Sequence, residues 1–121
     1  MLGNGQQDLI LTPGIGGPTE VEVLSGPQLI SEGMTASNAD PVAVFTPTGL
    51  GPNGQGLRVA VATSGVGDQV NVVVSTGRTM PGLAKVYAGA SFTSGTATEP
   101  TGGQLIDPFG GGTLTDGVFV G

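Results

Sequence analysis

The stretch that decides the fold runs from Gly56 to Gly77 and reads GLRVAVATSGVGDQVNVVVSTG. In each half, apolar residues recur at every second position, first from Leu57 and then from Val70. Because successive side chains of a strand point to opposite faces of the sheet, this period predicts two strands. The glycines at positions 65 and 67 can adopt the positive φ of a short hairpin loop. The stretch therefore predicts a β-hairpin.

Shorter apolar segments, separated by glycine and proline, predict further strands on both sides of this hairpin. They are residues 20–24, 41–46, 83–92 (with a bend at Gly89), 104–107 and 113–115. No helical spacing of apolar residues persists over three turns, so no helix is expected. Turn signals recur at roughly ten-residue spacing, which is typical of a sandwich, a jelly roll or a small barrel. We therefore expect an all-β fold, a compact sandwich or jelly-roll-like domain or a small barrel, with about eight short strands.

The length of 121 residues is that of one domain with a modest core. Residues 8–12 are mostly apolar and are followed by PGIGGP at 13–18, where proline and glycine interrupt regular structure. We divide the chain into an extended N-terminal arm over residues 1–18 and a single β domain over residues 19–121. The alternative is that the apolar part of the arm is an edge strand folded onto its own domain.

The formal net charge is −6, and the three cations are Arg58, Arg78 and Lys85. Binding of nucleic acid or of an anionic membrane surface needs clustered Lys and Arg, so neither is expected as a partner. No apolar run approaches the ~20 residues that cross a bilayer. The charge thus points away from nucleic acids and membranes.

The chain contains no His and no Cys. Catalytic triads, Cys–His pairs and ordinary zinc or heme sites are therefore excluded, and we expect no catalytic residues and no cofactor. The remaining candidates are carboxylates: Glu20 and Glu22 on one face of a strand, and Asp107 and Asp116 around the last loop. A hydrolase could use them as acid and base, but solvent-facing strand residues look the same. Calcium at Asp107 and Asp116 lacks any ligand-loop motif, so no metal is expected either.

A small, acidic, all-β chain without Cys or His and with a Gly/Pro-rich arm resembles the decoration (cement) proteins of tailed-phage heads. The resemblance lies in general make-up, with the arm at residues 1–18, a valine-rich sheet at 57–75 and Thr/Gly-rich loops at 93–116. It implies a structural protein of the virion, located on the outer surface of the capsid. It also implies a homo-oligomer, a trimer rather than a dimer, that clamps neighbouring subunits of the major capsid protein. Under this interpretation the chain is not an enzyme.

Two places are expected to contact a partner. Leu9, Ile10 and Leu11 could add a strand to the edge of a capsid sheet. Arg58 shares its strand face with small alanines and could pair with one of the carboxylates, in its own chain or in another subunit, or it could be an ordinary exposed sheet residue. The alternative function is a carbohydrate-binding β-sandwich of a virion fibre or a secreted lectin. The absence of Trp and the single Tyr weaken it, because sugars stack on aromatic rings.

Overall fold

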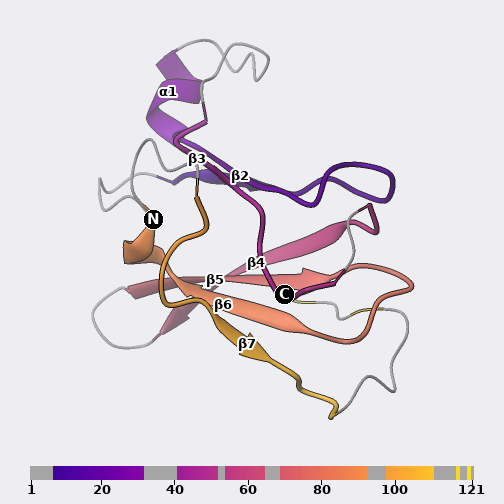
Figure 1. Cartoon of the computed structure of the whole chain (residues 1–121). Helices are drawn as coiled ribbons and strands as arrows, with labels where there is room; N and C mark the ends of the chain where they lie inside the picture. The colour runs from indigo at the N-terminus through magenta and orange to yellow at the C-terminus, as the bar shows by residue number, and fades with distance from the viewer. Residues whose placement is uncertain are drawn as a thin grey trace.

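The computed structural model describes residues 7–31, 41–51, 54–64, 69–92 and 98–110, together with Gly117 and Val120. Over these residues the chain forms two antiparallel sheets, which Figure 1 shows as two layers. The three-stranded sheet has the order β1 (Leu9–Leu11), β2 (Val21–Leu24), β3 (Ala43–Phe45). The four-stranded sheet has the order β4 (Leu57–Ser64), β5 (Gln69–Thr76), β6 (Ala84–Ala88), β7 (Gln104–Ile106). The expected all-β sandwich is thereby confirmed.

The predicted hairpin is confirmed as β4 and β5. Their register pairs Leu57 with Thr76 and runs without interruption to the pair Ser64 and Gln69. The loop predicted at residues 65–68 lies outside the described residues. One face of the hairpin enters the core, where Val72 and Val74 are fully buried. The alternation of valine in the sequence therefore marks the face of β5 that packs in the core.

The core lies between the two sheets and is built around three aromatic rings. Phe45 of β3 lies edge-on to Tyr87 of β6, with ring centroids 5.4 Å apart, and 5.7 Å from the ring of Phe92. The rings of Tyr87 and Phe92 are 6.0 Å apart. Such tilted ring contacts stabilise the fold beyond the contribution of the apolar area that the rings bury. The three rings thus join the layers that Figure 1 shows.

Residues 9–11 correct the prediction of an extended arm. They pair antiparallel with β2, from Leu9 opposite Leu24 to Leu11 opposite Glu22. This is the edge strand that the sequence left open as the alternative, and it forms because Ile10 packs against the core. Residues 1–6 lie outside the described part of the chain.

The expectation of no helix is wrong for residues 26–31, which form the short helix α1 (Gly26–Ser31) after β2. A helix of this length is too short to show a periodic sequence pattern.

The bend predicted at Gly89 is confirmed, because β6 ends just before it and the 3₁₀ turn η1 (Gly89–Ser91) follows. The strand predicted at residues 113–115 lies outside the described residues.

Candidate functional site

The first candidate surface is the outer edge of β1. Within the described ranges no strand pairs with the side of β1 that faces away from β2. Leu9 and Leu11 are 43% and 39% exposed, whereas Ile10 between them is turned toward the core. An open edge with exposed leucines is a template for pairing with another chain. The three residues expected to bind a partner are therefore on an edge strand of the folded domain.

The loop after β1 lies across the beginning of β4. The Leu57 N–H donates to the Pro13 carbonyl at 3.3 Å, and the Thr12 hydroxyl donates to the Leu57 carbonyl at 3.1 Å. The Gly16 N–H donates to the Gly54 carbonyl at 2.9 Å. These bonds join the N-terminal loop to the open end of the β4–β5 hairpin, where a hollow of about 120 Å³ remains.

This hollow, which we call the arginine hollow, is bordered by Arg58 at the start of β4 and Arg78 just after β5. Arg58 is half-buried, and its Nη1 donates to the Thr76 carbonyl at 3.3 Å. Arg78 is exposed. The sequence suggested a carboxylate partner or simple exposure for Arg58, and the structure adds this main-chain contact. Pairing with another subunit stays a prediction.

Two glycines allow the main chain to close around the arginine hollow. A Cβ on Gly77 would lie 2.4 Å from the Gln55 carbonyl oxygen and 2.7 Å from that of Gly56. Gly56 has a φ of +78°, and a Cβ there would lie 3.0 Å from the backbone of Gly14 and Ile15. Only glycine permits approaches this close, so the residues at both positions set the shape of the hollow.

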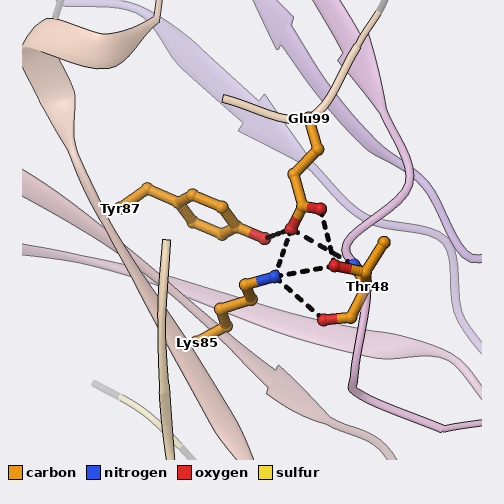
Figure 2. A network of polar contacts seen from close by, with 4 residues as sticks. All are labelled: Thr48, Lys85, Tyr87 and Glu99. Atoms are coloured by element: carbon orange, nitrogen blue, oxygen red, sulfur yellow. Dashed lines mark hydrogen bonds and ion pairs between the residues drawn. The ribbon is translucent and has the colours of Figure 1, made fainter. Parts of the chain in front are cut away.

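A second polar site, shown in Figure 2, joins three segments that are distant in sequence. We call it the Glu99 cluster: Thr48 after β3, Lys85 and Tyr87 on β6, and Glu99 before β7. Lys85 Nζ donates to Glu99 Oε1 at 2.5 Å and to the carbonyl and hydroxyl oxygens of Thr48 at 3.0 Å each. The Tyr87 hydroxyl donates to Glu99 Oε1 at 2.6 Å, and the Thr48 hydroxyl donates to Glu99 Oε2 at 2.7 Å.

The Glu99 cluster is a closed network. The three protons of the Lys85 ammonium group match its three acceptors. Among the described residues no buried side-chain nitrogen or oxygen is without a hydrogen-bond partner. Because every group is paired, the cluster can fix two loops onto the four-stranded sheet, but it presents no group poised for proton transfer to a substrate.

The cluster shifts the pKa values of its two acids in opposite directions. Burial alone would raise the pKa of Glu99, but hydrogen bonds from Lys85, Tyr87 and Thr48 outweigh it and lower the pKa from 4.5 to about 2. Burial, with the hydrogen bond to Glu99 and its negative charge, raises the pKa of the Tyr87 phenol far above its ordinary value. Glu99 is therefore ionised and Tyr87 neutral at ordinary pH.

We expect the contribution of Glu99 to stability to be lost in acid. Its pKa is lower in the folded than in the unfolded chain, so the contribution is complete above about pH 4.5 and declines as the pH falls toward 2. Urea unfolding of the wild type and of Glu99→Gln from pH 7 to pH 2 measures this. The difference in unfolding free energy between the two proteins should shrink over that interval. A difference that stays constant would contradict the shifted pKa.

The sequence did not predict the Glu99 cluster. In the sequence, Tyr87 stands out only as a possible ring for sugar stacking, and Lys85 only as one of the three cations. One signal was available. Lys85 and Tyr87 are two residues apart on one strand, so their side chains share a face, and they lie opposite the buried Val74 and Val72. A lysine therefore occupies a core-facing position. A charge at such a position needs a partner.

The described carboxylates considered for catalysis or metal binding belong to different sheets: Glu20 and Glu22 lie at or just before β2, and Asp107 follows β7. Glu22 alternates with the buried Val21 and Val23, so it points away from the core, and Asp107 is exposed. Asp116 lies outside the described residues. Among the residues that the structure describes, no group of three or more His, Cys, Asp or Glu could hold a metal ion. Also within them, no helix is long and apolar enough to cross a membrane.

No protein-family model, curated protein or solved structure matches the chain.

Proposed function

We propose that the chain is a structural protein of the virion. It is a decoration (cement) protein that binds the outer surface of an assembled phage head as a homo-oligomer, a trimer rather than a dimer, and stabilises contacts between major capsid subunits. The observation that carries this proposal is the open edge of β1 with its exposed leucines. Strand addition at such an edge gives affinity through main-chain hydrogen bonds and specificity through side chains.

The buried aromatic residues favour this role over sugar binding. Phe45, Tyr87 and Phe92 all lie in the core, so their faces cannot stack on a ligand. Among the described aromatic residues only Phe109 is exposed. Among the described aromatic residues, a carbohydrate could therefore stack only on Phe109, and we do not favour the lectin-like alternative.

The proposed stabilisation acts by mass action. A protein that binds the assembled lattice but not separate subunits lowers the free energy of the assembled state. The test is co-sedimentation of the chain with purified tailed-phage heads assembled without it and, separately, with the unassembled major capsid protein. We expect saturable binding to heads, little binding to unassembled subunits and a higher melting temperature of the heads. Absence of binding to heads, or equal binding to free subunits, would contradict the proposal.

A further inference from the structure

The face of the three-stranded sheet that points away from the core has a carboxylate between apolar side chains. Leu9 and Leu11 of β1 lie on this face, since Ile10 between them packs against the core. Glu22 of β2 lies opposite Leu11, and Val44 of β3 lies opposite Glu22. Paired residues of neighbouring strands share a face, so Leu11, Glu22 and Val44 form one row across the sheet, which we call the Glu22 row.

The charge in the Glu22 row has no counterpart nearby. Glu22 is half-buried, and no hydrogen bond or ion pair joins its carboxylate to the residues that the structure describes. Glu20, two residues before it, adds a second negative charge. Low polarity around a charge pair strengthens the attraction between the charges, so the apolar neighbours of Glu22 increase its attraction for a cation. The row therefore favours a basic side chain on whatever lies against it.

The open edge of β1 is the place where such a side chain can enter. A strand added to this edge would lie two strand spacings, roughly 10 Å, from β2. A residue of that strand opposite Leu11 would continue the Glu22 row. Lysine and arginine cover apolar surface with their alkyl part while the charged end stays in a polar place. At this position the alkyl part would pack on Leu11 and the charged end would extend toward Glu22.

A second copy of this chain does not offer such a strand. The two sheets end at four strands, β1, β3, β4 and β7, among the residues that the structure describes. The three cations of the chain are Arg58, Arg78 and Lys85. Lys85 lies within the four-stranded sheet in its ion pair with Glu99, and Arg78 lies in a turn. Only Arg58 is on one of the four strands, and its guanidinium already donates to the Thr76 carbonyl. The strand that fits the β1 edge therefore belongs to a different protein.

We propose that the partner segment that pairs with β1 has a lysine or arginine opposite Leu11, between apolar residues, and that this cation pairs with Glu22. This inference rests on the proposed function and names the chemistry of the capsid segment. Main-chain hydrogen bonds and apolar contacts would supply affinity. The ion pair would fix the register, because a slip by one residue turns the cation to the other face of the sheet. It would also oppose acidic segments, the chain itself included.

The test is an NMR titration of the full ¹⁵N-labelled chain with three end-blocked peptides, Thr-Val-Lys-Val-Thr and its counterparts with Gln or Glu in place of Lys. We expect the lysine peptide to shift the amide resonances of β1 in a saturable way, in the millimolar range. It should bind about three- to tenfold more tightly than the glutamate peptide, with the glutamine peptide between them, because a partly exposed ion pair contributes modestly. The preference should decrease as salt rises, because salt screens the charges.

Glu22→Lys should reverse the order of the peptides, so that the glutamate peptide binds more tightly than the lysine peptide. A purely structural role of Glu22 would not produce this reversal. Glu22→Gln retains the shape of the side chain and should remove most of the preference, which decides the matter if the spectrum shows that the lysine variant is unfolded. Thr101→Lys is the control: it adds a cation in an exposed turn before β7 and should keep the wild-type order.

Three results would overturn the inference: no shift of the β1 resonances, equal affinity of the wild type for the lysine and glutamate peptides, or a wild-type order of the peptides in both folded Glu22 variants. Such a failure with intact binding to phage heads removes only the basic residue from the partner segment. Preference for the lysine peptide without binding to heads supports the chemistry of the β1 edge and removes the proposed function.

Discussion

Replacing Phe45 by alanine is expected to lower the free energy of unfolding by about 3–5 kcal/mol. Phe45 is 2% exposed and is the one ring of the aromatic trio that comes from the three-stranded sheet. Its removal would leave a cavity between the sheets and end both ring contacts. This loss is a large fraction of the total, because the free energy of unfolding of a whole small domain is only about 5–15 kcal/mol.

Urea unfolding at one fixed protein concentration measures this loss, since association would make stability depend on concentration. The matched control is Phe109→Ala. Phe109 is 55% exposed, and its truncation should change stability by less than about 0.5 kcal/mol. If the two variants lost the same stability, the interface between the sheets would not be where the structure places it.

The second large effect is expected for Lys85→Met, which should lower the free energy of unfolding by about 2–4 kcal/mol. Methionine retains most of the length of the lysine side chain but removes the cation. Glu99 would then stay partly buried as an anion, with Tyr87 and Thr48 as its remaining donors. Such an uncompensated charge is costly, although the exposure of the Glu99 side chain, 20%, moderates the cost.

A double-mutant cycle isolates the ion pair. In Glu99→Gln the partner charge is absent, so the added loss from Lys85→Met should be smaller than in the wild type. Arg78→Met is the control for loss of a cation that is exposed, and its effect on stability should be small. Additive losses at positions 85 and 99 would contradict the coupling drawn in Figure 2.

Local patterns predicted much of the fold. The hairpin of β4 and β5 follows from a valine period that spans both strands. The bend at Gly89 was similarly visible as a break in an apolar run. In each case the deciding interactions lie between residues close in sequence, where a periodic pattern reports them.

Contacts between distant segments were not predictable in this way. The pairing of β1 with β2 depends on the packing of Ile10 against the core. In the sequence, a short apolar segment before Pro13 looks the same whether it is a free arm or an edge strand. The Glu99 cluster joins residues up to 51 positions apart. The arginine hollow joins residues from the N-terminal loop with the start of β4 and the end of β5, at the open end of the hairpin. Such sites depend on how the sheets pack, which single-strand patterns do not encode.

The most direct test of the central claim, that the open edge of β1 binds an assembled capsid, is co-sedimentation of Leu9→Lys/Leu11→Lys with phage heads. Lysine on an edge strand opposes pairing with another chain. The control, Ile30→Lys/Ile106→Lys, makes the same chemical change at two exposed isoleucines away from β1. We expect the β1 variant to keep its melting temperature and to lose at least about a hundredfold in affinity, as hot-spot contacts do, while the control binds like the wild type. Equal binding by the β1 variant and the wild type would contradict the claim.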